Sequence, residues 1–561
     1  MVSFKSGFEK SAGVGIYSLC LALAYLVFCL PIFSQTNSGR VVGPPDAVFF
    51  NGKVITVDSN FSVQQAFALK GDEFVAVGTN AKIRTLASKN TRLIDLRGHA
   101  VIPGLTDNHD HVYDSAKILL RGIDVVGLTS LPEMLDRIRE AVAKAKPGET
   151  VFTSAGSRVQ PALTKKDLDE ISGTVPIVAV RRRRGAALLN TAALRLAGIT
   201  RETQTFAGSP VPKDANGEPT GANPPNYPAG IILLDKVLPP MTDEEEEDLI
   251  LKAQQQRNAL GLTSVRDLSL FPEAMRAYYR VWRKGKLTIR VSMGLDLPDV
   301  ANIKQALNTW GVASDFGDTW LRLDSISEDP GPESEGLTAK QFSEVAIEAN
   351  RHGWRLAPHT VSDQDLAMAL DAYEAADRDS SIREKRWVLE HIPFVTPSQM
   401  DRIAKLGVVV SAQYAAYNGN LDEAIRTVGR ERAERQPPVR ELLDHHLIVS
   451  TGSDYIGGAA ETDNPLIPFY FYVTRKTKDG RVVGPEEKIS REEALRVSTI
   501  NYAYTTFEEK VKGSIEPGKL ADFLILSDDV LTVPDDKILS IHPLATYVGG
   551  REVFSTRNAI R

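Results

Sequence analysis

Cysteine is almost absent from this chain, which contains only Cys20 and Cys29 among 561 residues. Both lie in one apolar run close to the N-terminus, at residues 12–33, so a chain processed after this run would contain no cysteine at all. A framework of disulfide bonds and catalysis by a thiol are therefore excluded for the processed protein.

A basic field is also lacking, because the formal net charge is -6. Binding to nucleic acid needs clustered lysine and arginine side chains that displace counterions from the phosphates. We therefore expect no nucleic-acid partner. Apolar residues make up 42% and charged residues 25% of the chain, which is the balance of a folded globular protein.

Residues 12–33 carry no charge and follow Lys5 and Lys10, which is the order of the basic and apolar regions of a signal peptide. We expect residues 1–38 to be a signal peptide, or an uncleaved anchor that attaches the chain to a membrane through residues 12–33, because the run is long and its cleavage site is poor. The protein is then exported, either to the periplasm or out of the cell. The sequence leaves a homodimer open.

The middle of the chain alternates apolar strand segments with helical segments, a pattern typical of a parallel sheet with crossover helices. Eight strands are predicted, at residues 100–105, 262–267, 288–294, 321–326, 355–359, 387–392, 408–413 and 447–454. Eight is the number of strands that closes a barrel. We therefore expect an α/β protein in which residues 100–511 form a (β/α)8 TIM barrel.

Two further parts are expected around this barrel. The interval between its first two predicted strands is far longer than one crossover, so we interpret about residues 125–255 as an inserted lobe over the barrel mouth. Short strand patterns with turn residues occur at both chain ends, and they predict that residues 45–99 and 512–561 pair into one composite, β-sandwich-like domain.

Polar residues that bind metals stand at the ends of several predicted strands. His109 and His111 follow the first strand, and on an extended chain side chains at i and i+2 project to the same side, so both imidazoles can meet one ion. Two histidines at this spacing, taken by themselves, are more often surface residues than metal ligands. However, His359, His391 and Asp454 each end another apolar strand, at the rim where barrel active sites lie. Together the five residues predict a metal site.

These motifs resemble the amidohydrolase superfamily, and within it the YtcJ-like branch called amidohydrolase family 3. The resemblance covers about residues 46–554, and it is carried by PGLTDNHDH (103–111), LNTAAL (189–194), GLTSVRD (261–267), HTVSD (359–363), EH (390–391), GSD (452–454) and GSIEPGKLAD (513–522). It implies that the paired histidines, the two later histidines and the final aspartate are ligands of a metal or of its bound water.

The chain departs from the family pattern at the fourth predicted strand. The family carries there a lysine that bridges two metals as a carbamate, whereas Ser327 stands at this place. Glu328 offers a carboxylate, but it is offset by one residue and would face the other way on an ideal strand. We therefore expect a single divalent ion, with zinc as the first candidate and Glu328 as an uncertain ligand.

The candidate substrate contacts are Arg183, Arg184 and Gln413. Arg183 and Arg184 stand in the inserted lobe where the family carries Asp-Gly-His, and they are either a solvated turn or a guanidinium clamp for a carboxylate or phosphate. Gln413 ends the seventh predicted strand, where packing at the edge of the core is the alternative.

The resemblance implies a metal-dependent hydrolase, which cleaves a non-peptide C–N bond of a small-molecule amide, formamide or cyclic amide with a metal-activated water, and ester hydrolysis stays open as an alternative. Asp454 is expected to move the proton, and His391 either to bind the metal or to donate to the oxyanion. Two alternatives remain open: a non-catalytic metal-binding or regulatory descendant of this fold, and a structural or interaction protein of the cell envelope.

Overall fold

The computed structural model describes residues 43–556 except 126–127, 155–158, 160, 181–186, 226, 297–302, 329–336, 416, 418–420 and 456–463. The predicted signal peptide or anchor lies outside the described residues. Among those residues, no helix combines the length and the apolar character needed to cross a bilayer.

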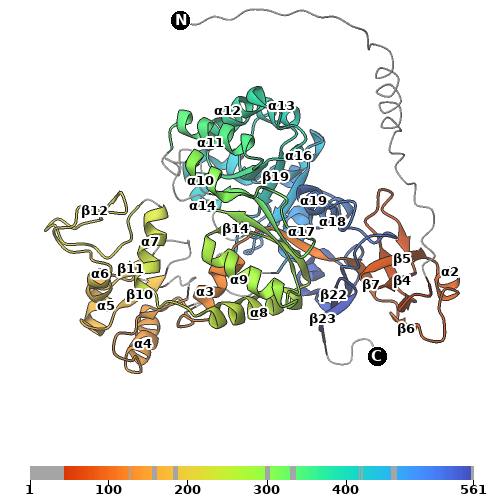
Figure 1. The fold of residues 1–561 in the computed structure, drawn as a ribbon, viewed down its shortest axis with the longest axis horizontal. Helices are drawn as coiled ribbons and strands as arrows, with labels where there is room; N and C mark the ends of the chain where they lie inside the picture. The colour runs from red at the N-terminus through yellow and green to blue at the C-terminus, as the bar shows by residue number, and fades with distance from the viewer. Residues whose placement is uncertain are drawn as a thin grey trace, which may run out of the picture. The chain divides into compact units, whose positions relative to one another are not determined.

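The centre of the fold is a sheet of eight parallel strands, in which every strand pairs with its neighbour along the chain (Figure 1). The strands are β8 (Leu105–Asp110), β14 (Leu262–Leu270), β15 (Arg290–Leu295), β16 (Leu321–Glu328), β17 (Leu356–Thr360), β18 (Val388–His391), β19 (Val409–Gln413) and β20 (Val449–Gly452). The last strand returns to the first: the backbone N–H of Asp454 donates to the carbonyl of His109 at 2.8 Å, and Asp110 forms a parallel bridge with Tyr455. The predicted (β/α)8 barrel is confirmed.

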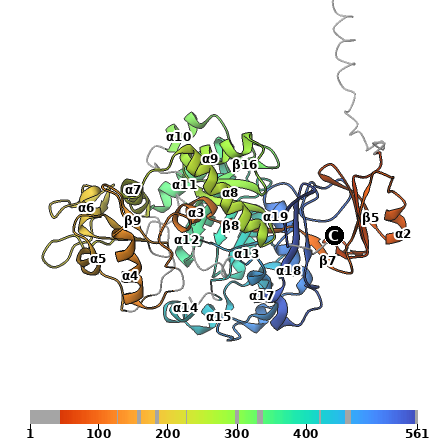
Figure 2. The ribbon, with the colours of Figure 1, turned by 90° about the horizontal axis from the view of Figure 1, so that it is seen from below.

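Helices surround these strands (Figure 1, Figure 2). They are α3 (Val112–Leu119), α8 (Asp243–Ala259), α9 (Pro272–Arg283), α10 (Ile303–Trp310), α11 (Ala339–Arg351), α12 (Asp363–Asp379), α13 (Pro397–Leu406), α14 (Leu421–Val428), α15 (Arg430–Arg435), α16 (Val439–Asp444), α17 (Leu466–Thr474), η4 (Pro485–Glu487), α18 (Arg491–Val497) and α19 (Ile500–Thr505).

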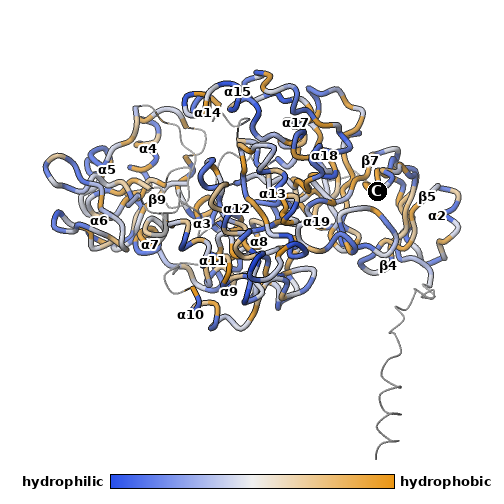
Figure 3. The backbone as a smooth tube through the Cα atoms, turned by 90° about the horizontal axis from the view of Figure 1, so that it is seen from above, coloured by the Kyte–Doolittle hydropathy of each residue, from blue (hydrophilic) through white to orange (hydrophobic). Residues whose placement is uncertain are grey.

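Several outer helices are amphipathic, and hydrophilic and hydrophobic stretches follow one another along the tube (Figure 3). In α9 the buried residues Ala274, Ala277, Tyr278 and Val281 recur at the spacing of one helical face, which packs on the barrel. Capping boxes mark several starts, as at Thr242 before α8, where the hydroxyl accepts from the N–H of Glu245. In the acidic run 243–248, which begins α8, Asp243, Glu244 and Glu245 are exposed, whereas Glu246 and Glu247 are partly buried and pair with Arg280.

The chain ends form two mixed sheets, of which the first combines strands from both ends and the second contains strands from residues 47–95. One is six-stranded, in the order β23 (Arg551–Ser555), β22 (Pro543–Val548), β21 (Phe523–Leu526), β7 (Ala100–Pro103), β2 (Lys53–Ile55) and β3 (Val63–Gln64). The other is four-stranded, in the order β5 (Glu73–Gly78), β4 (Ala66–Lys70), β1 (Ala47–Phe50) and β6 (Arg92–Asp95). The helices α2 (Asn80–Arg84) and η5 (Asp535–Ser540) accompany them. An aromatic core joins the two sheets: Phe49 and Phe67 stack at 4.8 Å, and Phe523 meets Phe67 edge-on at 4.9 Å.

The segment predicted as the first barrel strand, residues 100–105, is divided between two sheets. Ala100–Pro103 pairs with β2 and β21 in the six-stranded sheet, and the barrel begins at Leu105. The assignment of all these residues to the barrel was wrong, because Gly104 breaks the strand. A Cβ at Gly104 would lie 2.1 Å from Oγ1 of Thr263, so only glycine lets the chain pass β14 so closely.

The interval between α3 and α8 folds on its own cores. It contains α4 (Leu131–Val142), β9 (Val151–Phe152), α5 (Lys165–Ile171), β10 (Ile177–Val180), β11 (Ala187–Leu189), α6 (Thr191–Leu196), β12 (Thr205–Phe206), β13 (Ser209–Pro210) and α7 (Tyr227–Val237). Asn190 of the LNTAAL motif has a structural role, because its side-chain oxygen accepts from the backbone N–H groups of Ala193 and Ile177, each at 2.9 Å. It caps α6 and fixes this helix to β10.

Candidate metal centre

The five predicted ligands all lie at the carboxyl end of the barrel strands. His109 belongs to β8, His359 to β17 and His391 to β18, while His111 follows β8 directly and Asp454 follows β20. Because all strands of the barrel are parallel, these ends meet at one rim.

The first group of ligand atoms gathers around Asp454. Its Oδ1 lies 3.6 Å from Nε2 of His109 and 3.5 Å from Nε2 of His111. Metal–ligand distances of about 2.0–2.2 Å separate neighbouring ligand atoms by roughly 3–3.6 Å. Both distances therefore match the separation of two ligand atoms that share an ion. Both histidines are buried, whereas the Asp454 side chain is 36% exposed and faces the open side.

A second group gathers around Glu328. Its Oε2 lies 3.1 Å from Nδ1 of His359, and its Oε1 lies 3.6 Å from Nε2 of His391 and 3.6 Å from Nε2 of His109. The ligand atoms of His109, His111 and Glu328 lie within 4.8 Å of one another, and so do those of Glu328, His359 and His391. Glu328 is thus common to two possible ligand triads.

The expectation that Glu328 faces away from the site was wrong. Its backbone has a φ of 62°, and the same left-handed conformation occurs at His391 with 71° and at Asp454 with 51°. Such a residue no longer follows the alternation of an extended strand, so the end of β16 turns the carboxylate into the barrel mouth. Left-handed backbone outside glycine costs of order 1–3 kcal/mol and is typical of functional sites.

Several ligand atoms point at one another without any hydrogen bond. Nε2 of His109, Nε2 of His391 and Oε1 of Glu328 are buried and have no hydrogen-bond partner within the described ranges. Buried polar atoms are normally paired, so this arrangement is costly unless the lone pairs bind something else. Two imidazole nitrogens and a carboxylate oxygen are suitable ligands for a divalent ion, so the residues fit the metal that the sequence predicts.

The charges of the site also suit a cation. Burial would raise the pKa of Glu328, but His359 and His109 outweigh this effect and hold the pKa well below its usual range. Burial would likewise raise the pKa of Asp454, but the hydrogen bond from His111 and the charges of His109 and His391 lower it. Burial lowers the pKa of His391, and the neighbouring His359 lowers it further. Two carboxylates are therefore ionised near neutral pH, and His391 is held neutral.

The backbone around His109 and His111 is fixed by carboxylates that the sequence analysis gave no role. Asp107 accepts from the N–H groups of His109 at 3.1 Å and Ser453 at 3.0 Å, which ties β8 to the end of β20. Asp267 accepts from the N–H of Val112 at 2.8 Å and from the hydroxyl of Tyr278 at 2.6 Å, so it caps α3 directly after His111. The sequence contained a signal for both residues, because each is a charged residue inside an apolar strand segment. When such a group is buried it requires a partner, so a structural role could have been predicted.

Of the three predicted substrate contacts, the structure describes only Gln413. Arg183 and Arg184 lie outside the described residues. Gln413 ends β19 and is buried; its Nε2 donates to Oγ of Ser411 at 3.0 Å, and its Oε1 has no hydrogen-bond partner in the part of the chain that the structure describes. Ser327, at the place of the family lysine, accepts from the N–H of Ser269 at 3.3 Å.

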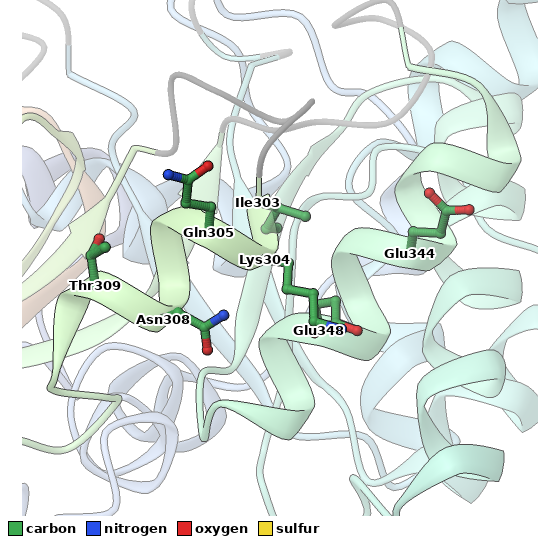
Figure 4. Close-up of a pocket in the computed structure, with 7 residues that line it drawn as sticks. All are labelled: Ile303, Lys304, Gln305, Asn308, Thr309, Glu344 and Glu348. Carbon is green, nitrogen blue, oxygen red and sulfur yellow. The ribbon is translucent and has the colours of Figure 1, made fainter.

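A separate hollow of about 610 Å³ lies outside the barrel, between α10 and α11 (Figure 4). Its lining includes Lys304, Asn308, Glu344 and Glu348. None of the converging ligands contributes to it, so it is distinct from the candidate metal centre.

The barrel and its rim of histidines and carboxylates define a class of protein, the metal-dependent hydrolases built on this fold. Residues 92–554 match the model of the Amidohydrolase family. The chain therefore belongs to this family, which confirms the resemblance found in the sequence.

Individual relatives agree with this assignment. The chain is similar to the protein LONG AFTER FAR-RED 3 of Arabidopsis thaliana, with 26% identity over 98% of this chain and 99% of that one. It is 29% identical to the N-substituted formamide deformylase of Arthrobacter pascens, over 90% of this chain and 97% of that one. An uncharacterised metal-dependent hydrolase from Pyrococcus furiosus shares the fold, with a TM-score of 0.66 and 23% identity over 87% of this chain and 100% of that chain.

Proposed function

We propose that this chain is a hydrolase that cleaves a non-peptide C–N bond of a small-molecule amide, formamide or cyclic amide. The observation that carries the proposal is the convergence of three buried ligand atoms that have no hydrogen-bond partner among the described residues, Nε2 of His109, Nε2 of His391 and Oε1 of Glu328. Membership of the Amidohydrolase family and the relative named as an N-substituted formamide deformylase support the class of bond.

The metal is held by this chain's own side chains in the following way. His109, His111 and Asp454 would hold one ion, for which zinc is our first candidate, because Oδ1 of Asp454 lies 3.6 Å and 3.5 Å from Nε2 of the two histidines and both imidazoles are buried. The side chain of His359 is 26% exposed, and it belongs to the second possible triad, which it forms with Glu328 and His391. When bound, a divalent ion of this kind lowers the pKa of a water ligand and polarises a carbonyl group.

Asp454 moves the proton in this proposal. Its carboxylate is ionised because the surrounding histidines lower its pKa, and its partial exposure leaves it accessible to water and substrate. It accepts a proton from the attacking water and transfers it to the leaving nitrogen, which requires hydrogen-bond reach of both. His391 either binds the ion or donates to the oxyanion; the zinc content of His391→Ala separates the two roles.

Gln413 contacts the substrate in this proposal. Its Nε2 is engaged by Ser411, whereas its buried Oε1 has an unused acceptor in the described part of the chain. An amide N–H of the substrate supplies the missing donor. The clamp proposed for Arg183 and Arg184 is tested separately, by comparing KM for neutral and anionic amides in the double alanine variant.

The test of the proposed metal centre is the double variant His109→Ala/His111→Ala. We expect purified wild-type protein to contain one zinc per chain by elemental analysis, and the double variant to contain none. An unchanged metal content in the double variant would reject this site, and two ions per wild-type chain would show that Glu328 joins a pair of metals.

Two other functions are separated by the same measurements together with a screen of amide hydrolysis. Metal without turnover supports the non-catalytic or regulatory descendant. Neither metal nor turnover supports a structural or interaction protein. Metal with turnover supports the hydrolase.

We also propose that the protein is exported, because residues 12–33 have the order of a signal peptide. N-terminal sequencing of the protein from the native cell distinguishes a cleaved segment from a retained anchor. A full-length chain in the soluble cytoplasmic fraction would reject export.

A further inference from the structure

A layer of buried charge lies inside the barrel next to the metal centre. Arg266 on β14, Asp324 on β16 and Glu390 on β18 come from alternate strands of the sheet, and their side chains are 0%, 1% and 0% exposed. Such a layer is normally filled by branched apolar side chains. Charges at this depth are costly unless each is paired, so their arrangement requires an explanation.

The charges form one connected chain. Nε of Arg266 donates to Oδ2 of Asp324 at 2.9 Å, and its Nη1 donates to Oε1 of Glu390 at 2.8 Å. Asp324 is also paired with the buried Arg355. Each carboxylate thus faces at least one guanidinium group, and Glu390 is fixed from one side by Arg266.

The other oxygen of Glu390 contacts the ligand His109. Nδ1 of His109 lies 2.7 Å from Oε2 of Glu390, and both side chains are fully buried. An ionised carboxylate only accepts hydrogen bonds, so the ring carries its hydrogen on Nδ1. In the neutral ring Nε2 then keeps its lone pair, and it is this atom that faces Asp454 and Glu328, each at 3.6 Å.

The second paired histidine has a backbone acceptor at this nitrogen. Nδ1 of His111 lies 3.2 Å from the backbone carbonyl of Leu268, a neutral acceptor. A charged acceptor on the far nitrogen of a metal-binding imidazole both fixes the ring and makes it a stronger ligand. The contact with Glu390 therefore strengthens His109 as a metal ligand.

We propose that Glu390, held in place by Arg266, is a positioning residue that keeps His109 in the tautomer required for metal binding and thereby raises the affinity of the centre for its ion. Glu390 does not touch the ion or the substrate. The inference rests on the proposed function, because it concerns the same metal centre.

The test compares the zinc affinity of wild-type protein and Glu390→Gln by competition with a chelator. We expect the variant to bind zinc roughly 10- to 100-fold more weakly, because the amide has the shape of the carboxylate but no charge. The matched control is Asp522→Asn, which removes a buried charge directly before β21 that pairs at 2.7 Å with Arg290, the first residue of β15. It should bind zinc as the wild type does.

The possible outcomes separate the two proposals. Unchanged zinc affinity in Glu390→Gln, or an equal loss in Asp522→Asn, would overturn the positioning role while the hydrolase proposal stands. A wild-type chain that binds no zinc would overturn both.

A measurement on the wild type covers the case in which Glu390→Gln does not fold. In zinc-loaded protein labelled with ¹⁵N-histidine, we expect His109 to show a solvent-protected proton on Nδ1 and a metal-bound Nε2. His109 is assigned by comparison with His109→Gln. A metal on Nδ1, or a hydrogen on Nε2, would overturn the inference.

Discussion

Oε2 of Glu328 lies 3.1 Å from Nδ1 of His359, although the two residues end neighbouring strands and are separated by 31 positions in the chain. The other oxygen of the same carboxylate faces His109 and His391. One side chain therefore contacts three of the predicted ligands, at the strand whose family lysine is replaced by Ser327. This relationship makes Glu328 the first residue to test.

Glu328→Gln should weaken zinc binding strongly. The substitution keeps the shape of the side chain but removes the negative charge that faces three imidazoles, and we expect a loss of roughly 10- to 100-fold in zinc affinity, measured by chelator competition. The matched control is Ser327→Ala, which removes one hydroxyl contact with Ser269 and should leave zinc affinity unchanged. Equal affinity in wild type and Glu328→Gln would place this carboxylate outside the metal centre.

Asp454→Asn should reduce turnover more than it reduces binding of substrate. An amide cannot accept the proton of the attacking water, so we expect kcat on a substrate found in the screen to fall by about 10²–10⁴-fold at saturating zinc. The control is Asp371→Asn, which removes an exposed carboxylate paired with Arg402 on the surface of α12 and should keep wild-type kcat. A variant that retains normal kcat while fully loaded with zinc would assign the proton transfer to another group.

Gly452→Ala should disturb both the fold and the metal centre. A Cβ at Gly452 would lie 2.4 Å from the backbone nitrogen of His109 and 2.5 Å from its Cβ, so β8 must shift. We expect a loss of roughly 1–3 kcal/mol in the free energy of unfolding together with weaker zinc binding. Gly173→Ala is the control, because nothing lies within 4 Å of a Cβ there. If Gly452→Ala unfolds and binds zinc like the Gly173 variant, the close approach of β20 to His109 is not required.

Acid should destabilise the barrel through Asp324. Burial would raise the pKa of Asp324, but Arg266 and Arg355 outweigh it and lower the pKa from 3.8 to about 2. A lowered carboxylate pKa contributes stability that is complete above about pH 4 and is lost as the pH falls toward 2, here about 2 kcal/mol. Asp324→Asn should have a lower free energy of unfolding than the wild type at neutral pH. Between pH 4 and pH 2, the decrease in this free energy should be about 2 kcal/mol smaller in the variant than in the wild type. Denaturant unfolding of zinc-free protein measures both values; parallel pH curves for the two proteins would contradict the role of Asp324.

Most of the barrel could be predicted from the sequence because its strands are short apolar segments that alternate with amphipathic helices. Seven of the eight predicted segments begin or end within a few residues of the observed strands. The exception is residues 100–105, which read as one apolar run although the chain leaves one sheet and enters another at Gly104. Apolar character reports burial, and both sheets bury this segment equally well.

The sequence by itself determined which side chains end the barrel strands, and the parallel arrangement of those strands then brings His109, His111, His359, His391 and Asp454 to one rim. Only the tertiary structure decided the roles of Glu328 and Glu390. The direction of Glu328 depends on a left-handed residue at the end of β16, which strand periodicity does not encode. The contact of Glu390 with His109 joins residues 281 positions apart. Hydrogen bonds across a closed barrel depend on which side chains its curvature brings face to face, and no local pattern of residues contains that information.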